Sequence, residues 1–169
     1  MLIGDGWAFI HTPKCGGTTL RAHLKGREVS EWLPMQGRHT VDHPFHWLAR
    51  ERPDGWVFTV QRSPESWLRS YWGHRMRHGW RDGMFLDQFR DDDLNEFMLR
   101  VARNATGYIT DMFDAYAKAY GGVEVIDISK LSYVLKLAKG KDAPAAHKNK
   151  GKALPVPRLM TLEMVEGRL

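Results

Sequence analysis

Three short apolar segments, residues 7–12, 56–61 and 123–128, constrain the fold of this chain more than any other feature. Each is rich in β-branched and aromatic residues, as buried strands are, and a helical pattern follows each. Strands that alternate with helices favour a parallel sheet, so we expect an α/β protein with three α/β/α layers and a central parallel sheet. Helices are expected at residues 18–24, from 64 onward, and at 44–50, 94–103, 108–120, 130–138 and 158–166.

The length and composition describe one soluble domain. A chain of 169 residues has the size of a single domain, which we expect to span residues 1–169. Hydrophobic residues make up 43%, and no window approaches the ~20 apolar residues of a membrane span. The single cysteine, Cys15, excludes an internal disulfide, and the N-terminus carries no secretory signal, so we expect a cytoplasmic protein. Residues 140–157, rich in Lys, Ala, Gly and Pro, are predicted to form a mobile loop.

Charge is segregated along the chain, although its net value is only +5. Residues 130–152 hold seven Lys against one Asp, and residues 62–81 hold five Arg against one Glu. Residues 82–99 hold six acids against one Arg. The basic segments fit either an anionic ligand or a solvated face, and the sequence leaves both interpretations open.

The loop after the first predicted strand, residues 11–19, has the composition of a phosphate-binding loop. In an open parallel sheet, ligands bind beyond the carboxyl ends of the strands, where this loop would lie. Gly16 and Gly17 allow the backbone to approach an anion closely, and Lys14 supplies a positive charge. Lys14 precedes both glycines, whereas the lysine of an ATPase-type loop follows the last glycine. The loop therefore predicts phosphate binding of a kind that differs from that of an ordinary ATPase.

Two motifs in this chain resemble those of one enzyme family. Residues 9–20 (FIHTPKCGGTTL) resemble the 5′-phosphosulfate-binding loop of sulfotransferases that use 3′-phosphoadenosine 5′-phosphosulfate (PAPS), especially the carbohydrate-type branch. The segment from Arg62 to Tyr71 resembles the 3′-phosphate motif of the same family, with Ser70 eight residues after the Arg. Arg can hold a phosphate as a fork while Ser donates a hydrogen bond. The resemblance implies a P-loop-like sulfotransferase fold with PAPS as cosubstrate.

Two weaker matches extend the resemblance over most of residues 7–150. Residues 37–40 resemble a family segment in which a basic residue and a His lie between the two phosphate motifs. Residues 146–150 resemble the late His-x-Asn segment of the family. Gln61 and Ser63 depart from the family pattern, in which an aliphatic residue and Asn or Asp are usual. The residues that the resemblance assigns to PAPS are Pro13, Lys14, Cys15, Gly16, Gly17, Thr18, Thr19, Arg62, Ser70, His147 and Asn149.

Sulfuryl transfer needs in-line attack by an acceptor oxygen, stabilisation of the leaving phosphate and removal of the acceptor's proton. The resemblance implies that Lys14 stabilises the bridging oxygen and that no metal is required. It favours His39 as the base, and His43 and His46 are competing candidates that could also contact the acceptor.

Residues 72–80 form a basic, aromatic segment that fits either an acceptor-binding loop or an exposed helix end. In the first interpretation, Arg75 or Arg77 would meet an anionic group of the acceptor. A metal site could be suggested by His39, Asp42, His43 and His46, because two His four residues apart share one face of a helix. Pro44 would interrupt that helix and no Glu completes a His-Glu-x-x-His arrangement, so we expect no metal. His74 and His78 have the same spacing.

Other function classes stay open beside the leading one. A Mg²⁺-dependent P-loop enzyme resembling a nucleotide kinase would bind ATP, but the position of the lysine and the lack of a convincing strand-end Asp disfavour it. A nonenzymatic nucleotide- or nucleic-acid-binding module would use the basic segments, with steep salt dependence, and is also disfavoured. The leading expectation is a sulfotransferase that acts on a hydroxyl of an acceptor such as a carbohydrate, with no membrane partner. A related protein that binds PAPS without turnover is a further alternative.

Overall fold

The computed structural model describes residues 1–28 and 51–139. In chain order the elements are β1 (Leu2–Gly4), β2 (Trp7–Ile10), α1 (Gly17–His23), β3 (Arg27–Glu28), β4 (Trp56–Gln61), α2 (Pro64–His78), η2 (Phe85–Phe89), α3 (Leu94–Asn104), α4 (Tyr108–Lys118), η3 (Ala119–Gly121), β5 (Glu124–Asp127), η4 (Ile128–Lys130) and α5 (Leu131–Lys139). The helices expected at residues 44–50 and 158–166, and the loop expected at 140–157, lie outside the described residues.

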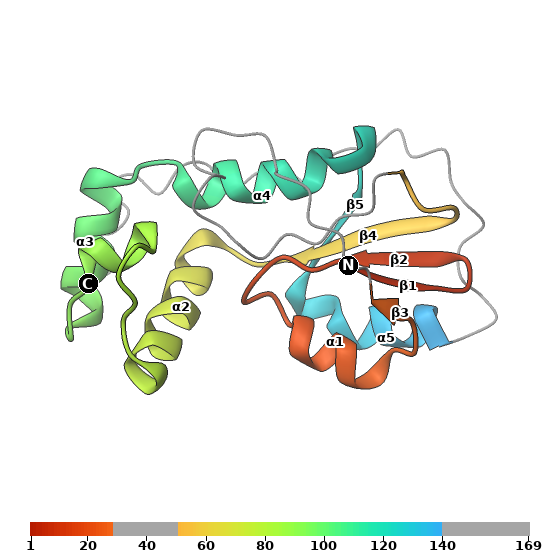
Figure 1. Ribbon diagram of the computed structural model, residues 1–169, viewed down its shortest axis with the longest axis horizontal. Coiled ribbons are helices and arrows are strands. Elements are labelled where there is room, and N and C mark those ends of the chain that lie inside the picture. The colour runs from red at the N-terminus through yellow and green to blue at the C-terminus, as the bar shows by residue number, and fades with distance from the viewer. Residues whose placement is uncertain (29–50, 140–169) are drawn as a thin grey trace.

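The five strands form one mixed sheet in the order β3-β1-β2-β4-β5 (Figure 1). β2, β4 and β5 are parallel, as the alternation of strands and helices predicts. β1 and β3 are antiparallel to their neighbours, so the expectation of a wholly parallel sheet is wrong for this side. The reason is the tight turn at Asp5 and Gly6, because an Asp-Gly pair favours a short hairpin, which joins only antiparallel strands.

Two of the helices begin at residues that cap them. Ser63 accepts a hydrogen bond from the N–H of Ser66, and Pro64 occupies the first position of α2, as predicted. Asp93 accepts a hydrogen bond of 2.7 Å from the N–H of Asn95 and starts α3. Each such cap contributes about 1 kcal/mol. Among the helices within residues 1–28 and 51–139, none combines the length and apolar character that crossing a membrane requires.

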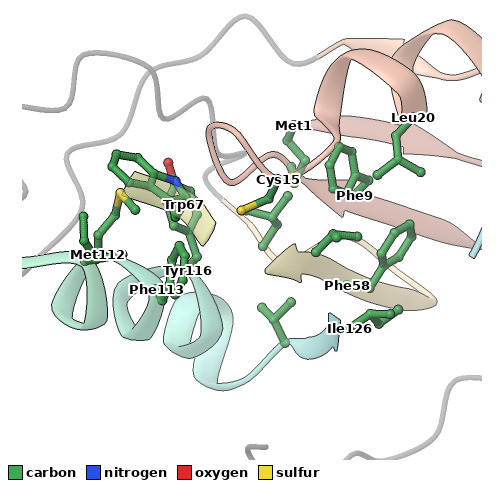
Figure 2. Close-up of a cluster of buried hydrophobic side chains, with 14 of the residues drawn as sticks. Met1, Phe9, Cys15, Leu20, Phe58, Trp67, Met112, Phe113, Tyr116 and Ile126 are labelled. Carbon is green, nitrogen blue, oxygen red and sulfur yellow. The ribbon is translucent and has the colours of Figure 1, made fainter. Parts of the chain in front are cut away.

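The strands carry a core that helices cover from two sides. α1 and α4 lie on opposite sides of the sheet (Figures 1 and 2), and α5 lies beside α1 (Figure 1). Phe9 and Phe58 from adjacent strands are buried with ring centroids 5.5 Å apart, and Leu20 of α1 and Tyr116 of α4 are fully buried around them (Figure 2). The described residues therefore form an α/β protein with a mixed, partly parallel sheet.

α2 and α3 pack against each other beyond the carboxyl ends of β2 and β4 (Figure 1). Their contact is aromatic: the ring of Tyr71 in α2 lies 6.4 Å from that of Phe97 in α3, between centroids. Within α2, Trp67 stacks on Tyr71 with ring centroids 5.1 Å apart. Large buried rings of this kind stabilise a contact by their area and by their ring geometry. This packing holds α2 next to the loop that follows β2.

Candidate functional site

The predicted phosphate loop and Arg62 meet at one edge of the sheet. The loop leaves the carboxyl end of β2 and enters α1, and Arg62 follows the carboxyl end of β4. β2 and β4 are adjacent and parallel, with Ile10 opposite Thr59, so both strands deliver their last residues to the same edge. The structure thus brings together two motifs that are about fifty residues apart in the sequence.

Buried side-chain hydrogen bonds hold the start of this loop against the sheet and α2. The Thr59 hydroxyl donates to the carbonyl of Ile10 at 2.9 Å. That hydroxyl has one hydrogen, so Thr12 is the donor in its 2.7 Å hydrogen bond with Thr59. Trp67 of α2 donates from Nε1 to the carbonyl of Pro13 at 2.8 Å. These contacts fix the backbone just before Lys14.

The loop backbone has an uncommon conformation at two residues. Gly16 has a φ of 80°, which glycine adopts without strain, but Lys14 also lies in the left-handed region, with a φ of 60°. A left-handed residue other than glycine costs about 1–2 kcal/mol. Such a residue persists only when its surroundings hold it, and it is frequent at functional sites.

Gly17 is required by the neighbouring His11 ring. A Cβ at Gly17 would lie 2.0 Å from Cδ2 and Nε2 of His11, so a side chain there would require the His11 ring to move. Burial, and after it the positive charges of Arg21, the N-terminus and Lys14, lower the pKa of His11 to about 4. His11 is therefore neutral at pH 7 and supports the loop by packing.

Cys15 is a buried structural residue of this loop. Burial raises the pKa of its thiol to about 12, and the charge and N–H groups of Arg62 act in the opposite direction. A thiol with this pKa is not a nucleophile at neutral pH. The assignment of Cys15 to a phosphate ligand therefore rests on its backbone alone, and its side chain brings Arg62 against the loop.

Arg62 has unused hydrogen-bonding capacity. Its Nε is buried and has no hydrogen-bond partner among the described residues. Leaving a buried donor unsatisfied costs about 1–3 kcal/mol, and more when the group is charged. Buried polar groups normally find a partner, so the Arg62 Nε is a donor that remains available at this edge of the sheet.

Lys14 lies in a cluster of positive charges. Its pKa is lowered to about 8, first by burial and then by Arg75 and Arg77 of α2. No carboxylate of the described residues pairs with Lys14, Arg62 or Arg77, whereas other arginines do have acidic partners: Arg21, Arg69, Arg75, Arg90 and Arg100. This edge of the sheet therefore carries uncompensated positive charge, which an anion would stabilise.

The predicted hydroxyl donors flank this cluster. Thr18 and Thr19 are exposed in the first turn of α1. Ser70 is partly buried on α2, three residues after Trp67 and on the same side of the helix. Because Trp67 contacts the loop at Pro13, Ser70 also lies on the loop-facing side of α2.

The structure corrects the assignment of Arg75 and of residues 72–80. This segment is helical to His78, so it is not an acceptor-binding loop. Arg75 is only 4% exposed and donates from Nε to Asp87 at 3.0 Å and from Nη2 to the Tyr71 hydroxyl at 3.1 Å. Asp87 also accepts hydrogen bonds from the Tyr71 hydroxyl and, at 2.7 Å, from the N–H of Arg81. The guanidinium of Arg75 is thus occupied within the protein and cannot meet an acceptor anion.

Several predicted site residues lie outside the described part of the chain: His39, His43, His46, His147 and Asn149. Sequence reasoning gave little weight to His74, which lies on the same side of α2 as Trp67, the residue that contacts the loop. The signal in the sequence was its separation of seven residues from Trp67, which puts both on one side of a helix.

The described residues do not build a metal site. Among them, no group of three or more His, Cys, Asp and Glu side chains is arranged to hold a metal ion. Asp127 ends β5 at the same edge of the sheet, but its carboxylate accepts a 2.8 Å hydrogen bond from the N–H of Ser129 and caps η4. That hydrogen bond also lowers the pKa of Asp127.

The described geometry therefore supports an anion site made of Lys14, Arg62, Ser70 and the loop backbone. Comparison of the chain with family models, with curated protein sequences and with solved structures finds no match.

Proposed function

We propose that this chain binds PAPS at the edge formed by β2 and β4 and transfers its sulfuryl group to a hydroxyl of an acceptor. The observation that carries the proposal is the meeting of Lys14 and Arg62, both without an acidic partner among the described residues, at the ends of adjacent parallel strands. Two separated cationic groups suit a ligand with two separated phosphates. We further propose that the fold is the three-layer, P-loop-like sulfotransferase fold.

The side chains of the site fit such a ligand. Arg62 would hold the 3′-phosphate through its unpartnered Nε, and the Ser70 hydroxyl would donate a second hydrogen bond. The bare backbone at Gly16 and Gly17 would contact the 5′-phosphosulfate, with the Thr18 hydroxyl beside it. PAPS supplies the sulfuryl group and a phosphate leaving group.

Lys14 would act on the leaving group. At pH 7 its ammonium keeps its proton, because its pKa of about 8 lies above that pH. A preorganised cation stabilises the negative charge that develops on the phosphate oxygen as the bond to sulfur breaks. The acceptor's proton needs a separate base; the sequence favours His39, which lies outside the described residues.

Calorimetric titration tests this proposal. We expect adenosine 3′,5′-bisphosphate to bind more tightly than adenosine 5′-monophosphate or ATP, with EDTA present. Arg62→Ala should weaken the binding of the bisphosphate by about 10- to 100-fold, because it removes a charge-assisted hydrogen bond. Arg69→Ala is the matched control, because Arg69 lies in α2, the helix that follows Arg62, and pairs with Glu65 at 3.1 Å.

The same titration separates the alternatives. Tight binding of ATP only with Mg²⁺ would replace the proposal with a phosphoryl-transfer enzyme. Equal, salt-sensitive binding of any nucleic acid without preference for the bisphosphate would replace it with a nucleic-acid-binding module.

A further inference from the structure

We infer that His74 of α2 is the residue that takes the proton from the acceptor hydroxyl during sulfuryl transfer. This inference rests on the proposed function and adds a catalytic residue to it. It also differs from the expectation that the sequence favours, in which His39 is the base.

The geometry of α2 places His74 on the side that faces the loop. Trp67 marks this side by its 2.8 Å hydrogen bond to the Pro13 carbonyl. Seven residues on an α-helix fall about 20° short of two full turns and advance about 10 Å. His74 therefore lies on the same side as Trp67, further along the helix, and Ser70 lies between them. Lys14 follows Pro13 directly in the loop, and its positive charge is one of those that act on the His74 ring.

The His74 ring is available for proton transfer. It is partly exposed, and neither ring nitrogen forms a hydrogen bond with another described residue. Among the described residues, its ring contacts that of His78, with centroids 4.4 Å apart and planes inclined by 45°. A base must have a free nitrogen, and that nitrogen must lie within hydrogen-bond reach of the acceptor. His74 meets the first of these two conditions.

The charges that face His74 keep its ring neutral. Lys14 acts on it from the loop, and His78, Arg75 and Arg77 act on it from α2. Together with burial, which is the largest cause, these positive charges lower the pKa of His74 to about 4. A bound phosphosulfate would neutralise this cationic cluster, so the pKa of His74 should rise toward the value at which imidazole is an efficient base.

The acceptor oxygen forms a bond to sulfur while its proton moves to a ring nitrogen of His74. The bond between sulfur and the bridging oxygen breaks, and its electron pair stays on the 5′-phosphate beside Lys14. His74 leaves the step as an imidazolium and returns its proton to water.

Turnover of ³⁵S-labelled PAPS with water as the acceptor tests this role. We expect His74→Gln to lower kcat by about 10²- to 10⁴-fold, the range typical of general-base catalysis, with little change in the KM for PAPS. The dependence of kcat on the ionisation of a base should also disappear in this variant. Arg69→Gln, five residues earlier on the same helix and paired with Glu65, is the matched control and should keep the activity. Wild-type turnover in His74→Gln, or loss of turnover only in His39→Gln, would overturn the inference.

A second measurement separates this inference from the proposed function. Histidine side-chain resonances can be titrated by NMR with and without adenosine 3′,5′-bisphosphate, using His74→Gln for assignment. We expect the pKa of His74 to rise by at least one pH unit when the bisphosphate binds. Binding without this rise would refute the role of His74 and leave the proposed function standing. No binding of the bisphosphate at all would refute both.

Discussion

Replacing Asp87 with alanine should destabilise the protein strongly. Asp87 is 3% exposed and accepts hydrogen bonds from Tyr71, Arg75 and the N–H of Arg81. Asp87→Ala removes these acceptors and leaves the Arg75 guanidinium, 4% exposed, without its counter-charge. Breaking a buried ion pair from one side costs about 3–5 kcal/mol.

The expected loss is large enough to measure by two methods. At about 2–4 °C of Tm per kcal/mol for a domain of this size, Asp87→Ala should lower the Tm by roughly 6–20 °C. Urea unfolding followed by tryptophan fluorescence should give a matching fall in the free energy of unfolding. Trp67, Trp72 and Trp80 lie close to the Asp87 cluster in the sequence and report on this part of the protein.

A matched control removes an acid that is not buried. Asp82 is fully exposed and lies 3.5 Å from Arg90, so Asp82→Ala should change the free energy of unfolding by at most about 1 kcal/mol. Replacing both members of the buried pair, as in Arg75→Met with Asp87→Leu, should recover much of the stability. A loss within about 1 kcal/mol for Asp87→Ala would refute the argument that this pair is buried and coupled.

Three further outcomes follow from the site. Lys14→Ala should abolish transfer while adenosine 3′,5′-bisphosphate still binds measurably, whereas Arg62→Ala should mainly weaken binding; equal affinity losses with unchanged turnover in both would contradict these roles. Gly17→Ala should cost about 1–3 kcal/mol in urea unfolding, because its Cβ would meet the His11 ring, and a neutral result would show that the ring moves away freely. The pKa of His11 is lowered to about 4, so as the pH falls the unfolded chain binds a proton at this histidine before the folded protein does. The stability that the neutral His11 contributes is therefore complete above about pH 6.5 and is lost as the pH falls toward 4. Unfolding curves of the wild type and of His11→Gln between pH 7 and pH 4 should differ by on the order of 3 kcal/mol in this loss, and parallel pH profiles would exclude the effect.

Local signals in the sequence predicted much of the edge of the sheet where the site lies. The apolar segments became β2, β4 and β5, and Ser63 capped α2 as expected. The Asp5-Gly6 pair was an equally local signal for the β1–β2 hairpin, and it was missed because β1 has only three residues. Gln61, an exception to the family pattern, donates to the Phe113 carbonyl at 2.8 Å, a contact that no local pattern contains.

The sequence by itself determined which groups could bind an anion, because the chemistry of Lys14, the two glycines and Arg62 does not depend on how the chain folds. Only the tertiary structure decided which of these charges are free. Arg75 and Arg77 look alike in the sequence, yet packing of α2 against η2 buries Arg75 with Asp87 and leaves Arg77 exposed. The contact of Trp67 with the loop also sets which side of α2, the side that carries His74, faces the loop. Pairing between residues that are distant in the sequence depends on how helices pack, and the cost of burying an unpaired charge then selects the partners.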